Sequence, residues 1–162
     1  MMKSCLSTPV GYLHIHSEDG FIRVIHFSDE PLEGPYDEAP ELQACLRQLG
    51  EYFAGSRTHF DFPMQQGGTP FQQSVWNGLL QIPFGKTCSY RDLSKQLGDV
   101  KAIRAVGTAN GRNQLAIVVP CHRVIGSDRS LTGYAGGLHR KQWLLAHEAR
   151  HAGGAQQLGL DW

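Results

Sequence analysis

The 162-residue sequence contains no apolar run that approaches the roughly 20 residues needed to span a lipid bilayer. Its first residues also lack the long apolar core of a secretory signal peptide. We therefore expect a soluble, cytoplasmic protein with no membrane partner. Cysteine is scarce as well, and the four cysteines form no Cys-x-x-Cys pair. This spacing argues against a disulfide framework and predicts free thiols in a reducing compartment.

The chain also lacks net charge, since 15 basic residues balance 15 acidic ones. The balance hides an asymmetry, because residues 1–89 hold five Lys/Arg against ten Asp/Glu, whereas residues 90–150 hold ten against four. A basic half on a neutral protein indicates that one face meets a polyanion.

The first 66 residues read as a small α/β (α+β) domain. Residues 10–16 and 21–27 alternate apolar and polar side chains and predict two strands of an antiparallel sheet joined by a turn. Apolar residues then recur at helical spacing from Leu42 to Phe53, and Gly55 ends the helix. The glycine-containing segment 65–68 reads as a linker to a second domain.

Residues 67–162 are expected to form a winged-helix-like domain. Thr69 followed by Pro70 is typical of a helix start. Ser89 begins a second helix that Gly98 ends, and a third follows directly. Two short helices about a glycine-containing turn, each with a basic outer face, are the sequence form of a helix-turn-helix. That pattern alone is weak, because many helical hairpins bind nothing.

A reactive thiol is the most informative feature of the second half. The β-branched segment 115–119 predicts a buried strand, and Pro120 ends it, so Cys121 and His122 can act together only beyond the strand. Nearby cationic partners lower a thiol pKa and raise its nucleophilicity. For the Cys-His pair alone, an inert buried cysteine is an equal alternative.

Three segments extend this pattern. They read IPFGKTCSYRDLSKQLG at 82–98, AIRAVGTANGRN at 102–113 and IVVPCHRVIGSDRSLTGYAGGLHRKQWLLAHE at 117–148. Together they closely resemble the O6-alkylguanine-DNA alkyltransferases, the methylated-DNA–protein-cysteine methyltransferase family. The resemblance implies direct-reversal DNA repair, in which an alkyl group moves irreversibly from O6-alkylguanine, and in some cases O4-alkylthymine, to a cysteine of the protein. It also implies a ribonuclease-like fold for residues 1–66.

By this resemblance Cys121 is the alkyl acceptor of a single-turnover transferase. His122 would be its base, acting through a water, and Glu148 would orient the histidine. Without the resemblance, His122 would read as a polar residue after a strand and Glu148 as a solvated carboxylate at a helix end.

The resemblance further implies substrate and DNA contacts. Arg104 would fill the gap left by a flipped guanine, and Tyr90 would donate to that base. Asn113 would tie the recognition helix to the cysteine segment. The full set of expected contacts is Tyr90, Arg104, Asn113, Arg123, Tyr134, Ala135 and Gly136. One departure is Arg129, which stands where the family commonly has a turn glycine. We expect Arg129 either to make the turn at 127–130 less able to adopt a left-handed conformation or to add a phosphate contact.

Double-stranded DNA, bound through its minor groove, is the partner that the resemblance implies. A monomer is the default state, and cooperative assembly on DNA stays open. We expect no cofactor and no metal, although a zinc site could be sought among Cys5, His14, His16 and His26. Two other functions compete: a non-enzymatic alkyl-lesion sensor, in which tryptophan commonly replaces the cysteine, and a regulator switched by alkylation. Cys121 argues against the first, and the lack of a four-cysteine cluster argues against the second.

Overall fold

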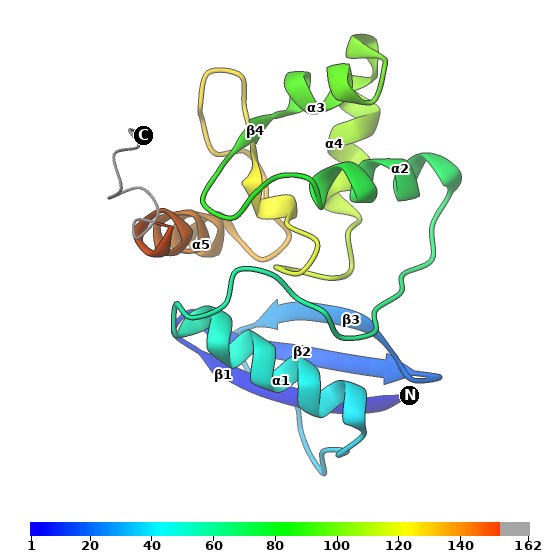
Figure 1. The fold of residues 1–162 in the computed structure, drawn as a ribbon, viewed down its shortest axis with the longest axis vertical. Helices are drawn as coiled ribbons and strands as arrows, with labels where there is room; N and C mark the ends of the chain where they lie inside the picture. The colour runs from blue at the N-terminus through cyan, green and yellow to red at the C-terminus, as the bar shows by residue number, and fades with distance from the viewer. Residues whose placement is uncertain (153–162) are drawn as a thin grey trace.

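The computed structural model describes residues 1–152 and places the two halves of the chain against each other (Figure 1). The N-terminal half contains strands β1 (Met2–Thr8), β2 (Gly11–Glu18) and β3 (Phe21–Ser28), which form an antiparallel sheet in the order β1-β2-β3. Helix α1 (Pro40–Phe53) covers one face of this sheet. The predicted α/β fold class with a small antiparallel sheet is confirmed.

The N-terminal core follows from the alternation of the strands. Leu13 and Ile15 of β2 and Ile25 of β3 are buried beneath Leu42 and Leu49 of α1. The predicted hairpin is confirmed. Strand β1 was not predicted, because its residues show no clear alternation of apolar and polar side chains and its position in the sheet depends on long-range pairing with β2.

The C-terminal half is mainly helical. Its elements are α2 (Pro70–Leu79), β4 (Cys88–Ser89), α3 (Tyr90–Gln96), the 3-10 turn η1 (Val100–Ala102), α4 (Ile103–Gly111), the 3-10 turn η2 (Cys121–Arg123), β5 (Val124–Ile125) and α5 (Leu138–His151). Thr69 and Gln72 form a capping box at the start of α2. Ser89 caps α3 by accepting from the backbone N–H of Asp92 at 2.9 Å. Both predicted helix starts are confirmed.

The predicted strand at 115–119 is wrong. Only Leu115 pairs with a strand, through an isolated bridge to Ile25, and the chain then turns, with Ile117 at φ 72°. The backbone N–H of Val119 donates to the carbonyl of Leu115 at 3.0 Å. The side chain of Asn113 donates to the carbonyls of Leu115 and Val119, and this support lets a β-branched segment form a buried turn.

The first of the two expectations for Arg129 is also wrong. Its φ is 68°, so this exposed residue adopts the left-handed conformation that glycine usually supplies. The backbone N–H of Gly126 donates to the carbonyl of Ser130 at 2.9 Å and closes the turn around it.

The two halves share an interface that carries the site. The backbone of Ile25 in β3 exchanges hydrogen bonds with Gln114 and Ala116, and Gln66 bonds both Asn113 and Gln114. The division into domains at 1–66 and 67–162 stays a prediction, and its last ten positions lie outside the described residues. Within residues 1–152 no helix is long and apolar enough to cross a membrane.

Candidate functional site

Cys121 begins the 3-10 turn η2, directly after Pro120. Its side chain is 7 % exposed and lines a cavity of about 160 Å³ at the interface between the two halves. The walls of this cavity come from β3 and from the second half of the chain. They include Ile25, His26, Phe27, Asn113, Ala116, Tyr134, Ala135 and Gly136. The nucleophile therefore lies at an enclosed, largely apolar site.

His122 is fully buried next to the thiol-bearing residue. Its Nε2 lies 2.6 Å from Oε2 of Glu148, so Nε2 carries the proton that it donates to the carboxylate. Its Nδ1 has no hydrogen-bond partner among the described residues and keeps a free lone pair. Burial lowers the pKa of His122, and the positive charges of Arg123 and Lys141 act in the same direction against the opposing effect of Glu148. The imidazole is thus a neutral base.

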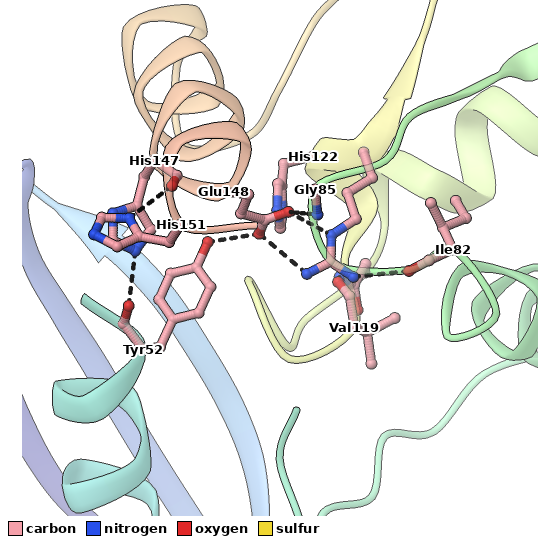
Figure 2. Close-up of polar contacts among 10 residues, drawn as sticks. Tyr52, Ile82, Gly85, Val119, His122, His147, Glu148 and His151 are labelled. Atoms are coloured by element: carbon pink, nitrogen blue, oxygen red, sulfur yellow. Dashed lines mark hydrogen bonds and ion pairs between the residues drawn. The ribbon is translucent and has the colours of Figure 1, made fainter. Parts of the chain in front are cut away.

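Glu148, on α5, is the centre of the site (Figure 2). Its Oε2 accepts from His122, from the Tyr52 hydroxyl at 2.6 Å and from Nη2 of Arg123 at 3.1 Å. Its Oε1 accepts from Nε of Arg123 at 2.7 Å and from the backbone N–H of Gly85 at 3.4 Å. Burial alone would raise the pKa of Glu148, but the hydrogen bonds from His122 and Arg123 and the positive charge of Arg123 lower it overall. The carboxylate is ionised.

The predicted DNA contact of Arg123 is not supported, because this side chain points inward. It is 6 % exposed and holds Glu148 through two parallel hydrogen bonds. Its remaining donor, Nη1, bonds the carbonyl of Ile82 at 2.8 Å. A motif that places Arg beside Cys-His gives no sign of the direction in which the side chain points. Arg123 compensates a buried carboxylate.

The thiol itself is protonated at rest. Burial raises the pKa of Cys121, against the opposing effects of Asn113 and of Lys141. Lys141 is fully buried, and its Nζ donates to the carbonyl of Val124 at 2.6 Å. The sequence predicted a thiol pKa lowered by cationic neighbours, but desolvation exceeds their effect. A thiol in this state needs a base to take its proton before it can react as a thiolate.

The cavity wall places Tyr134, Ala135 and Gly136 beside Cys121, as a substrate site there requires. The Tyr134 hydroxyl is buried and has no hydrogen-bond partner among residues 1–152. Burial and the nearby Cys121 and Glu148 raise the pKa of Tyr134, so its hydroxyl is a donor.

Tyr90 is the first residue of α3, and Asn113 follows the end of α4. The Tyr90 hydroxyl accepts from Thr132 at 3.0 Å and from Asn110 at 3.4 Å, which leaves its own proton free to donate. Asn113 donates to the carbonyls of Leu115 and Val119, and so shapes the turn before the thiol.

Arg104 lies apart from this cluster. It is on the exposed side of α4, opposite buried Val106 and Ala109. The structure therefore joins Cys121, His122 and Glu148 at the core of the site and leaves Arg104 on the outer helical face.

Sequence reasoning missed Tyr52, Lys141 and Gly85. Tyr52 follows Leu49 at helical spacing and would be read as a core residue, because its partner Glu148 is 96 positions away. Lys141 would be read as a solvated lysine on an amphipathic helix. Neither Tyr52 nor Lys141 carries a local sequence signal for its place in the site.

Across residues 1–152, no group of three or more His, Cys, Asp or Glu side chains is placed to hold a metal ion. The ring centroids of His14 and His26 are 5.0 Å apart, but Nε2 of His14 bonds the carbonyl of Glu30.

Comparison with known proteins gives two family matches. Residues 1–66 match the family model described as "6-O-methylguanine DNA methyltransferase, ribonuclease-like domain". Residues 70–150 match the model described as "6-O-methylguanine DNA methyltransferase, DNA binding domain".

Individual relatives agree with these matches. The chain is 46 % identical over 151 residues to a methylated-DNA–protein-cysteine methyltransferase of Mycolicibacterium paratuberculosis, covering 91 % of this chain and 92 % of the relative. It is 47 % identical to the constitutive enzyme of that name from Bacillus subtilis, covering 80 % and 83 %.

Solved structures show the same similarity. The fold matches the crystal structure of the Mycobacterium tuberculosis O6-methylguanine methyltransferase with a TM-score of 0.84 and 40 % identity, covering 93 % of this chain and 94 % of the other. A structure of the M. tuberculosis protein in complex with DNA matches with the same TM-score and 39 % identity over the same shares.

Proposed function

This chain belongs to the 6-O-methylguanine DNA methyltransferase family, and from that premise we propose that it repairs alkylated DNA by transferring the alkyl group from guanine O6 to its own Cys121. It is a methylated-DNA–protein-cysteine methyltransferase. The observation that carries the assignment to Cys121 is that the next residue, His122, is buried and bonded to Glu148, with Nδ1 of His122 unprotonated.

The reaction begins with removal of the thiol proton. A water carries this proton from Cys121 to Nδ1 of His122, and Glu148 stabilises the imidazolium that forms. The thiolate attacks the alkyl carbon, a sulfur–carbon bond forms, and the bond between that carbon and O6 breaks. The guanine anion takes up one proton from the Tyr90 hydroxyl, and the His122 imidazolium returns the thiol proton, through solvent, to the tyrosinate that this leaves. Net, the alkyl group moves to sulfur and the thiol proton moves to guanine.

The product is a thioether, which is not hydrolysed under cellular conditions. Each molecule therefore reacts once, and the chemistry needs no cofactor. Cys121 and its base also separate this function from that of a lesion sensor, which needs neither. The four free cysteines suit a reducing compartment, and we place the protein in the cytoplasm.

The DNA partner is the damaged duplex. We propose that α3 and α4 approach it from the minor groove and that the target guanine is flipped into the cavity at Cys121, with Arg104 filling its place in the stack. A monomer suffices for this reaction, and cooperative assembly on the duplex remains an additional proposal.

The test is the intact mass of the protein after incubation with a duplex containing O6-methylguanine. We expect a gain of one methyl group that peptide mapping locates on Cys121, and no gain in Cys121→Ser. Duplex affinity should persist in Cys121→Ser, because phosphate contacts supply most of it. Methylation of Cys5, Cys45 or Cys88 instead would overturn the assignment.

A further inference from the structure

Tyr52, in the last turn of α1, reaches from the N-terminal half into the site (Figure 2). Its side chain is fully buried, and its hydroxyl donates to Oε2 of Glu148 at 2.6 Å. Oε2 is the same oxygen that accepts from His122 at 2.6 Å. The N-terminal half thus contacts the atom on which the base depends.

The phenol ring is held firmly in this place. Its centroid lies 5.2 Å from that of Phe53 and 6.0 Å from that of Phe84, both in edge-on geometry. The carbonyl of Tyr52 accepts from Nε2 of His147 at 2.7 Å, so this one residue of α1 is joined to two adjacent residues of α5. A hydroxyl so fixed presents its proton in one direction.

We infer that Tyr52 is a positioning residue for the transfer reaction: its hydroxyl fixes Glu148 and limits how strongly Oε2 accepts from His122. The inference rests on the proposed function, because it concerns the base of that reaction. Tyr52 touches neither the thiol nor its cavity, and it acts through Glu148.

The physical basis is the sharing of one oxygen among donors. Each hydrogen bond to Oε2 withdraws negative charge from it, so the Tyr52 hydroxyl weakens the pull of the carboxylate on the His122 proton. Burial and the nearby Glu148 raise the pKa of Tyr52, which keeps the phenol protonated and able to donate. The result is an imidazole that stays neutral at rest, with Nδ1 open.

Other titratable groups also face the His122–Glu148 pair. From α5 come Lys141 and His147, from η2 come Cys121 and Arg123, and from the cavity wall comes Tyr134. None of these is altered by removal of the Tyr52 hydroxyl. Packing does not require that hydroxyl either, since a phenylalanine would keep every ring contact.

The experiment compares Tyr52→Phe with the unmodified protein by single-turnover transfer from a saturating O6-methylguanine duplex between pH 5.5 and 9. Without the hydroxyl, Oε2 carries more charge and the imidazolium of His122 is stabilised. We expect the acid limb of the profile of rate against pH to move to higher pH by about 0.3–1 unit. This shift corresponds to part of the free energy of one charge-assisted hydrogen bond. The matched control is Tyr36→Phe, which removes an exposed hydroxyl bonded to the Leu32 carbonyl and should leave the profile unchanged.

A second substitution should shift the acid limb in the opposite direction. Fluorinated tyrosine at position 52 keeps the ring and makes the phenol a stronger donor, so the acid limb should move to lower pH. NMR titration of the His122 ring in both variants should show the same two directions.

The outcomes are distinguishable. Identical profiles and identical His122 titrations in all variants would overturn the inference and reduce Tyr52 to a packing residue, whatever the effect on thermal stability. Absence of transfer by the unmodified protein would instead refute the proposed function. Weaker duplex binding with an unchanged profile would also overturn a positioning role.

Discussion

Glu148 shows how one buried carboxylate can serve both stability and chemistry. Arg123 compensates its charge through two parallel hydrogen bonds, while His122 uses the same group to fix its tautomer. A carboxylate with no arginine beside it would favour a protonated histidine, which could not accept the thiol proton. The ion pair therefore keeps the base neutral, and the buried thiol needs such a base because its own pKa is raised.

The first prediction concerns this residue. Glu148→Gln keeps the shape of the side chain but leaves the buried Arg123 charge unpaired, which should cost about 3–5 kcal/mol of unfolding free energy. The imidazolium loses its partner as well, so the transfer rate should fall roughly 10²-fold, within the range of general-base effects. Urea unfolding and single-turnover rates measure the two effects.

The control for that substitution is Glu51→Gln, which breaks the partly exposed pair with Arg57 on the surface of α1. It should change stability by less than about 1 kcal/mol and leave the rate unaltered. A Glu148→Gln protein that unfolds and reacts like the Glu51→Gln protein would refute the role of Glu148.

At the scale of elements, sequence patterns located those whose cause is local. The caps of α2 and α3 depend on side chains three residues apart, and the hairpin of β2 and β3 depends on alternation. Strand β1 depends on pairing with β2 and was not predicted, and the segment 115–119 was wrongly predicted as a strand because the side chain of Asn113 supports a turn there. The same division holds for the site: Cys121 and His122 are adjacent in sequence, whereas the link from Tyr52 to Glu148 exists only in the folded chain.

Helix α4 carries the second prediction. Arg104→Ala should slow repair at saturating duplex, because extrusion of the base costs a few kcal/mol that an inserted guanidinium offsets. The rate with free O6-benzylguanine, which needs no extrusion, should change much less. Both rates are measured as single turnovers.

Arg112→Ala is the matched control, since it removes one exposed positive charge from the C-terminal end of the same helix. We expect it to weaken duplex affinity and to reduce the salt dependence by about one counterion, without slowing the saturated reaction. Equal proportional losses for Arg104→Ala with duplex and free base would rule out insertion into the stack.

At the scale of the whole molecule, the interface between the two halves contains neutral histidines. His122 bonds Glu148, and His147 donates to the carbonyl of Tyr52 while its ring stacks on Trp143 at 4.8 Å. Both side chains are at most 1 % exposed. The interface between the halves therefore includes imidazoles that are buried in their neutral form.

The last prediction follows from the pKa values of these two groups. Burial lowers the pKa of His122 and of His147 below the ordinary value of 6.5. Between that value and the folded pKa, the unfolded chain binds more protons than the folded chain. Stability is thus fully present above pH 6.5 and is lost as the pH falls, by up to about 1.4 kcal/mol per pH unit for each histidine. His16 and His26 shift in the same direction, but they lie on the more open face of the sheet and should contribute less.

Urea unfolding at several pH values between 8 and 5.5 measures this loss. The free energy of unfolding should be nearly constant above pH 7 and should fall below pH 6.5. His147→Gln can still donate to the Tyr52 carbonyl but cannot take up a proton. The slope of its unfolding free energy against pH should therefore correspond to about one proton fewer. His59→Gln, on the exposed surface, should keep the full slope. A flat profile down to pH 5.5 in the unmodified protein would show that these histidines are not held neutral by the fold.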